Sequence, residues 1–304
     1  MAWRLHLTNQ AIRRVDILPG KPALAAAWAG RGRVSYFDLE SGVPAGEAVH
    51  RAPVVEPRQG IKWQEFVTGL TAPNGAPLPF VQAGGAAVHT TEDGRMRLYH
   101  TGADLFLESE GKEIKLETGG VAFIAVGLDR FLGLVAALDE NCRLTIYQQH
   151  IRVGVFETGL QAGEYLQPVV AVANGGSAIF ACDGRQVALL DSGGRVRRRL
   201  NAHYAIGRLA CSPNGRLIAT SDAETGVIRV YSGADFTPTH QRHALDLLQE
   251  ATQIQLIEDI PPGAAGVGAL GVHNTGDLAF AVSGMICVTH VKHMTALPRP
   301  QPLL

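Results

Sequence analysis

The sequence predicts an all-β fold, a β-propeller of six or seven four-stranded blades that is closed by the N-terminal strand. Three observations lead to this prediction. Six hairpin-like units recur along the 304 residues. The closest units follow one another at about 40 residues, which is the period of a four-stranded propeller blade. Helix signals are scarce, and the best of them covers residues 240–251.

The most regular unit runs from Arg208 to Tyr231. Its turn, Ser212-Pro213-Asn214-Gly215, has a physical basis, because Pro presets φ and Asn-Gly accepts positive φ. The residues on both sides alternate as in half-buried strands. Five further hairpins follow the same plan, with strands at 24–29 and 34–38, 87–91 and 95–99, 134–138 and 144–147, 178–182 and 187–190, and 278–282 and 285–288.

One propeller domain is expected to account for residues 1–297. A single four-stranded sheet cannot bury both of its faces, whereas blades stacked in a ring bury one another. The segment 3–8 alternates like a strand, so we expect it to complete the last blade. The two longest sequence intervals between hairpins contain insertions or one degenerate blade. The number of blades is therefore either six or seven. The Pro-rich end, residues 298–304, is expected to form an extended tail.

The unit around residues 203–231 resembles a WD repeat. His203 precedes the Ser-Pro-Asn-Gly turn at about the spacing of that family. Ser221 and Asp222 follow the turn, and Tyr231 stands where the family has Trp. The resemblance implies that these four residues form a hydrogen-bonded tetrad inside the blade. No unit ends on Trp-Asp, so the chain is similar to divergent members of the WD-repeat propeller family.

Charge and motif content argue against several classes of function. Lys and Arg number 27 against 28 Asp and Glu, a formal net charge of −1, so nucleic acid is not expected as a partner. No stretch of about 20 apolar residues is present, so membrane insertion is not expected. The chain has no G-x-S-x-G elbow, P-loop or H-E-x-x-H motif, and we expect no catalysis, cofactor or metal. Four scattered cysteines without a C-x-x-C pair indicate a reducing, cytoplasmic setting.

These observations favour a non-enzymatic scaffold, or a subunit of a larger assembly, that binds one or more proteins through rim loops. Fold alone does not imply function, so this expectation rests on analogy. The alternative is a hydrolase or lactonase-like enzyme with its site at the axial channel. Its candidate carboxylates recur at the second turn of their units, at Asp93, Asp139, Asp183 and Asp222. The simpler role for these residues is to cap tight turns.

Two groups of residues are candidates for partner binding. Arg58, Trp63, Tyr165 and Tyr204 lie in segments between blades, and Trp, Tyr and Arg are favoured interface anchors. Alternatively, each aromatic ring packs against its own loop. On a strand, Arg195, Arg197 and Arg199 would share one face and form a docking patch for an acidic partner. Alternatively, they belong to a solvated outer strand whose charges discourage edge pairing.

Overall fold

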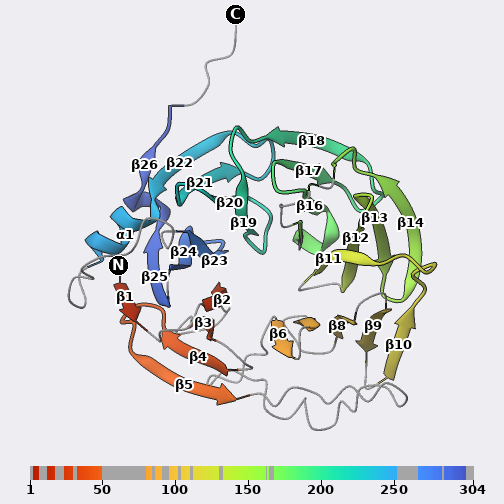
Figure 1. Cartoon of the computed structure of the whole chain (residues 1–304), viewed down its shortest axis with the longest axis horizontal. Coiled ribbons are helices and arrows are strands. Elements are labelled where there is room, and N and C mark those ends of the chain that lie inside the picture. The colour runs from red at the N-terminus through yellow and green to blue at the C-terminus, as the bar shows by residue number, and fades with distance from the viewer. Residues whose placement is uncertain are drawn as a thin grey trace, which may run out of the picture.

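A computed structural model describes residues 3–6, 12–17, 24–29, 33–49, 80–83, 86–90, 96–101, 104–109, 112–129, 133–161, 163, 168–251, 266–282 and 284–298. The prediction of an all-β fold is confirmed, because strands dominate these residues and α1 (Ala244–Glu250) is the only α-helix among them. Figure 1 shows the sheets arranged around a central axis in a propeller-like ring, with one strand of each sheet near the axis.

Six antiparallel sheets lie in the described part of the chain. They are β2–β5 (Ile12–Ile17, Leu24–Ala29, Arg33–Asp38, Pro44–Val49), β6–β10 (Phe80–Ala83, Ala86–Thr90, Met96–Thr101, Asp104–Ser109, Lys112–Leu116), β11–β14 (Phe123–Leu128, Leu134–Asp139, Arg143–Gln148, Ile151–Glu157), β15–β18 (Val169–Ala173, Ala178–Cys182, Gln186–Leu190, Val196–Asn201), β19–β22 with β26 (Ile206–Cys211, Leu217–Asp222, Val227–Ser232, Pro238–His243, Thr295–Ala296), and β23–β25 with β1 (Val267–Val272, Asp277–Val282, Met285–His290, Trp3–His6).

Five predicted hairpins supply the second and third strands of their sheets, and the unit 208–231 spans β19, β20 and β21. Two sheets depart from the expected four strands. In one, β10 adds a fifth strand outside β9. In the other, β26 pairs with β22, opposing Ala296 to His240 and Thr295 to Gln241. The end of the predicted domain is thus held to the outer edge of a sheet that lies earlier in the sequence. Residues 299–304 of the expected tail lie outside the described residues.

The N-terminal strand occupies the position that the sequence predicts. β1 pairs with β25 as an antiparallel outer strand, with Trp3 opposite Val288 and His6 opposite Met285. The next strand, β2, lies in a different sheet, and its apolar side chains Ile12 and Val15 share one buried cluster with residues of the last sheet. A strand pairing and a packed interface therefore connect β1 and β2 to the sheet that contains β23–β25.

Apolar side chains fill the spaces between neighbouring sheets. All six residues of β12 are buried, because its sheet is covered on both faces. Leu144 and Ile146 of one sheet pack in a common cluster with Val170 and Ile179 of the next. Fully burying such a side chain contributes about 1.5–3 kcal/mol. This packing fixes how adjacent sheets sit, and so it positions the turns at their ends.

The helix is shorter than the sequence predicts. Residues 240–243 belong to strand β22, and α1 begins at Ala244. His243 acts as the N-cap, because its Nδ1 accepts the Leu245 N–H at 3.2 Å. Leu247 and Leu248 are buried, and the Leu248 carbonyl accepts a 2.7 Å hydrogen bond from Arg4 of β1. No helix in the described ranges is long and apolar enough to cross a membrane.

Candidate partner-binding groove

A groove lies between the sheets β15–β18 and β19–β22 and has a volume of about 970 Å³. Its walls are the β15–β16 and β17–β18 turns on one side and the β19–β20 and β21–β22 turns on the other. These four turns belong to one rim of the ring, because they join the strands at the same ends. A rim of the ring is where the sequence predicts that partners bind.

The β17–β18 turn is organised by Asp191. Its carboxylate accepts the backbone N–H groups of Arg195 at 2.9 Å and Gly193 at 3.1 Å. These hydrogen bonds, that of Arg195 foremost, and the Arg197 charge lower the pKa of Asp191 below its ordinary value. Arg197 forms a 2.7 Å ion pair with the carboxylate, and 54% of its side chain remains exposed. A fixed carboxylate and a partly exposed guanidinium therefore share this wall.

The β19–β20 turn is fixed by side-chain hydrogen bonds. Ser212 Oγ donates to Asn214 Oδ1 at 2.8 Å, and the Arg216 N–H donates to the same oxygen at 3.0 Å. Gly215 has a φ of 68°, which Gly adopts without strain. The Asn214 N–H also donates to Asn274 Oδ1 in the next sheet at 2.9 Å. The exposed Arg216 side chain is therefore carried by a rigid turn.

The β21–β22 turn closes the second wall. The Gly233 N–H donates to the Arg216 carbonyl at 2.8 Å. A Cβ at residue 233 would lie 1.9 Å from the Gly215 carbonyl oxygen, so this close approach requires Gly. Phe236 of the same turn packs edge-on against Phe180 of the neighbouring sheet, with ring centroids 6.3 Å apart. The two sides of the groove are thus tied together by an aromatic contact.

Of the four predicted loop anchors, the structure describes Tyr204. Arg58, Trp63 and Tyr165 lie outside the described residues. Tyr204 is half-buried, and its contacts are with strands of its own sheet. Its hydroxyl is 2.7 Å from Thr220 Oγ1 and 2.8 Å from Tyr231 Oη. The Arg229 guanidinium lies 4.0 Å from the centroid of its ring. These contacts hold Tyr204 inside the sheet.

The expected tetrad is replaced by this hydroxyl network. His203 is exposed, and Ser221 Oγ is buried without a hydrogen-bond partner. The reason is strand alternation, because Tyr231 lies opposite Ile218, which puts Tyr231 on the same face as Thr220 and Ser221 on the other. Asp222 instead accepts the N–H groups of Glu224 and Thr225 at 3.0 and 3.1 Å. The WD-like pattern thus identifies Tyr231 of the network correctly. It indicates His203 and Ser221 where the network uses the adjacent residues Tyr204 and Thr220.

The three predicted arginines do not share one face. Arg195 precedes strand β18, and the register shifts at Arg197, so that Arg198 lies opposite Leu189 and Val196 opposite Leu190. This β-bulge breaks the alternation on which the prediction depended. Arg197 turns to Asp191 in the groove, whereas Arg199 donates to the Thr158 carbonyl of the neighbouring sheet. All three side chains are exposed, and Arg197 and Arg199 contact different partners.

The recurring aspartates that the structure describes cap their turns. Asp139 accepts the N–H groups of Asn141 and Arg143, and Asp183 accepts those of Arg185 and Gln186, at 2.7–2.9 Å. Asp93 lies outside the described residues. Within the described chain, no group of three or more His, Cys, Asp or Glu is placed to hold a metal ion. Among the carboxylates of the hydrolase alternative, Asp139, Asp183 and Asp222 are therefore engaged by backbone groups of their own turns.

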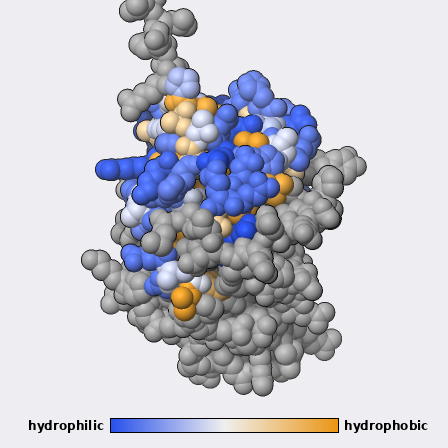
Figure 2. Space-filling model, turned by 90° about the vertical axis from the view of Figure 1, so that its left-hand side faces the viewer, coloured by the Kyte–Doolittle hydropathy of each residue, from blue (hydrophilic) through white to orange (hydrophobic). Residues whose placement is uncertain are grey.

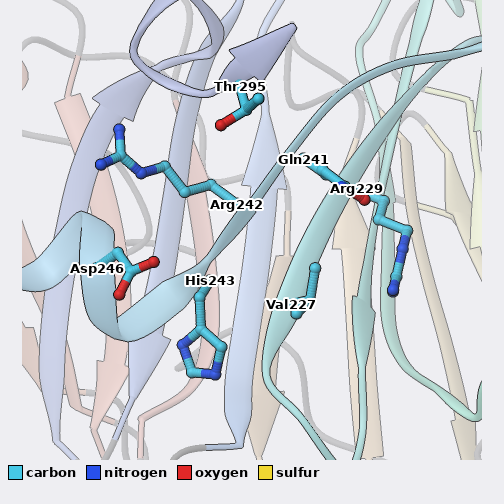
Figure 3. Close-up of a pocket in the computed structure, with 7 residues that line it drawn as sticks. All are labelled: Val227, Arg229, Gln241, Arg242, His243, Asp246 and Thr295. Carbon is cyan, nitrogen blue, oxygen red and sulfur yellow. The ribbon is translucent and has the colours of Figure 1, made fainter. Parts of the chain in front are cut away.

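A second hollow lies beside β21, β22, α1 and β26 (Figure 3). Two of its lining residues, Arg242 and His243, help to hold these elements together. Arg242 donates to the His293 carbonyl at 2.6 Å and pairs with Glu250, while His243 caps α1. Figure 2 shows that polar residues cover much of the described part of this side. We therefore regard this hollow as structural and the groove as the better candidate site.

Comparisons with known proteins bear on the fold. No family model matches the sequence, and no curated protein matches it. Among solved structures, the chain is similar to the crystal structure of Raptor from Chaetomium thermophilum, with a TM-score of 0.63 and 8% sequence identity. The similarity covers 97% of this chain and 29% of that chain, so this chain spans less than a third of that protein. At this identity the likeness shows a shared fold alone.

The groove residues carried little signal in the sequence. The sequence indicates Arg197 as a member of the arginine cluster, and it indicates a turn at Ser-Pro-Asn-Gly. Arg216 lies in the β19–β20 turn and Ala234 in the β21–β22 turn. Nothing in the sequence indicates that these two turns face Asp191. Only the packing of two neighbouring sheets brings these residues together. The one usable signal is the order of the turns, because turns after the first and third strands of each sheet lie at the same rim. That order assigns the groove residues to a common rim.

Proposed function

We propose that this chain is a non-enzymatic protein-interaction module, a six-bladed WD-repeat-like propeller closed by β1. One or more protein partners bind at the rim groove between β15–β18 and β19–β22. The observation that carries this proposal is the groove itself, a hollow of about 970 Å³ with walls fixed by internal hydrogen bonds. A pre-formed site lowers the entropy that binding must overcome.

The charged groups of the groove favour a partner segment with an acidic side chain. Arg216 is exposed on the β19–β20 turn, and Arg197 remains half exposed beside Asp191. An acidic side chain that reaches Arg216 would form a charge-assisted hydrogen bond. The exposed Ala234 and the neighbouring Ser192 leave room for an extended backbone between the two walls. The proposed occupant is therefore an extended protein segment that carries Asp or Glu.

Six blades and closure by β1 are supported by the six described sheets and by the β1–β25 pairing. The proposed compartment is the cytoplasm. It is supported by the four cysteines, which are all free. Burial raises the pKa of Cys182 and of Cys287 to about 12, so these thiols stay protonated and unreactive.

Affinity capture of partners from the lysate of the cells that make the protein tests the proposal. Wild type and Arg216→Glu are compared with Lys112→Glu, a control on the exposed strand β10 of a different sheet. We expect the partners recovered by wild type to be depleted about tenfold or more with Arg216→Glu, since reversing a charge at a charge pair costs at least about 1.4 kcal/mol. Equal recovery with all three proteins, or no recovery with wild type, contradicts the proposal.

A further inference from the structure

Strand β14 exposes several large apolar side chains. β14 is the outermost strand of its sheet, and no strand pairs with its outer edge in the described part of the chain. Ile151, Val153 and Val155 are 63%, 47% and 39% exposed. They are three of the five large apolar side chains that stand exposed among the described residues. An exposed apolar edge strand is a template for pairing with another strand.

Three other outer edges carry a run of charges or are covered by a further strand. β18 carries Arg197, Arg198 and Arg199, whose charges oppose pairing. β22 is covered by β26, and β9 is covered by β10. The β26–β22 pairing also shows that an outer edge in this ring accepts an additional antiparallel strand. Figure 1 shows β14 on the outside of the ring, away from both chain ends.

A β-bulge places the two charges of β14 on one face. Arg152 lies opposite Tyr147 and Glu157 lies opposite Arg143, while the register shifts around Val153. Tyr147 and Arg143 are four residues apart on a strand and share a face. Arg152, Val155 and Glu157 are therefore on the same face of the sheet, and all three are exposed. A regular strand would have put Arg152 and Glu157 on opposite faces.

We propose that β14 pairs antiparallel with β14 of a second copy, about a two-fold axis at Val155. Because this axis is perpendicular to the sheet, side chains on one face of the first copy meet the same face of the second copy. Val155 lies opposite Val155 of the second copy, and Gly154 lies opposite its Phe156. Val153 is the extra residue of the bulge and has no opposite residue. Arg152 therefore lies opposite Glu157 of the second copy. The two-fold axis generates this charge pair twice, so the edge is complementary to itself, as an isologous interface requires.

One strand pairing buries less surface than stable interfaces do, which is at least about 1,200 Å². The dimer is therefore expected to be weak and concentration dependent. This inference does not rest on the groove, because β14 lies in another sheet. Dimerisation and partner capture can fail separately, so the two proposals are distinguishable.

Sedimentation equilibrium over a range of concentrations of the full chain tests the pairing. We expect wild type to show a reversible monomer–dimer equilibrium. Val155→Arg sets two like charges opposite each other and should raise the dimer dissociation constant about tenfold or more. Val43→Arg is the matched control, since Val43 is 59% exposed in the β4–β5 turn, and it should leave the equilibrium unchanged.

Charge reversal tests the register. Arg152→Glu alone and Glu157→Arg alone each create two like-charge pairs and should weaken the dimer about tenfold. The double variant restores opposite charges and should return the dissociation constant to within about twofold of wild type. A chain that stays monomeric at every concentration, a dimer insensitive to Val155→Arg, or a double variant as weak as the single ones overturns the proposal. Circular dichroism of each variant confirms that the fold is retained.

Discussion

Three hydroxyl groups tie the loop before β19 to the middle of its sheet. Tyr204 Oη lies within hydrogen-bond distance of both Thr220 Oγ1 and Tyr231 Oη. Burial raises the pKa of Tyr231, which keeps its hydroxyl protonated and able to donate. The Arg229 guanidinium covers the Tyr204 ring and lies 3.6 Å from the Asp222 carboxylate. A single loop residue thus links strands β20 and β21.

Tyr204→Phe should lower the free energy of unfolding by about 1–2 kcal/mol, because it leaves the Thr220 and Tyr231 hydroxyls without their partner. His203→Ala should change it by less than about 0.5 kcal/mol, since His203 is exposed. Urea denaturation of the two variants measures both values. A larger loss for His203→Ala than for Tyr204→Phe would favour the WD-like tetrad over the network described above.

The turn carboxylates predict how stability depends on pH. Backbone N–H groups lower the pKa of Asp191, chiefly that of Arg195, and the pKa of Asp235, chiefly that of Thr237. Because their folded pKa values lie below the unfolded ones, their contribution is present above about pH 4. It is lost as the pH falls through the folded values.

The melting temperature should therefore fall between pH 5 and pH 3, and Asp191→Asn should make this fall smaller. Ser192→Ala, at an exposed position of the same turn that carries no titratable group, serves as the control and should leave the fall unchanged. Differential scanning calorimetry across this range measures both. A wild-type melting temperature that rises on acidification would contradict the assignment of these carboxylates as charged turn caps.

At the scale of elements, the end of the described chain acts as a strap between two sheets. After β25, the 3₁₀ turn Val291–His293 leads to β26, which pairs with β22. Met294 is 6% exposed and belongs to the cluster that contains Leu247 and Leu248 of α1. The Leu297 N–H donates to the Thr239 carbonyl at 2.8 Å. The strap therefore holds α1 between β22 and β25.

Met294→Ala should lower the free energy of unfolding by about 2–3 kcal/mol through the lost burial and the cavity it leaves. Thr295→Ala, at the exposed neighbouring position, should cost less than about 0.5 kcal/mol. Urea denaturation compares the two, and limited proteolysis reports whether β26 has been released. Equal stability of both variants would show that the strap does not contribute to the packing of α1.

Elements with a local signal were predictable from the sequence, and those held by distant contacts were not. The hairpin 178–182 and 187–190 appears as β16 and β17 with nearly the same bounds, because alternation and a Gly turn are local. The residues 240–243 read as the start of a helix, yet they form β22 by pairing with β21. Strand β26 has two residues and no pattern of its own. Its existence depends on β22.

At the scale of the whole molecule, the arrangement of sheets creates a site that no single unit contains. The groove combines Asp191 and Arg197 of one sheet with Arg216 and Ala234 of the next. A sequence pattern can identify each turn but cannot place one turn against another. The ring was predictable from repetition, whereas the groove follows from how two repeats pack at one rim. The proposed binding function therefore depends on the assembly of repeats.

Site-specific photo-crosslinking tests the central claim most directly. A photo-crosslinking amino acid is placed at Ala234, exposed in the groove wall, and at Lys112, exposed on β10. The account predicts that the Ala234 position forms a covalent adduct with the captured partner, that Arg216→Glu in the same chain abolishes this adduct, and that the Lys112 position forms none. Adducts from Lys112 but not from Ala234, or adducts at Ala234 that survive Arg216→Glu, would contradict the claim that partners bind in the groove.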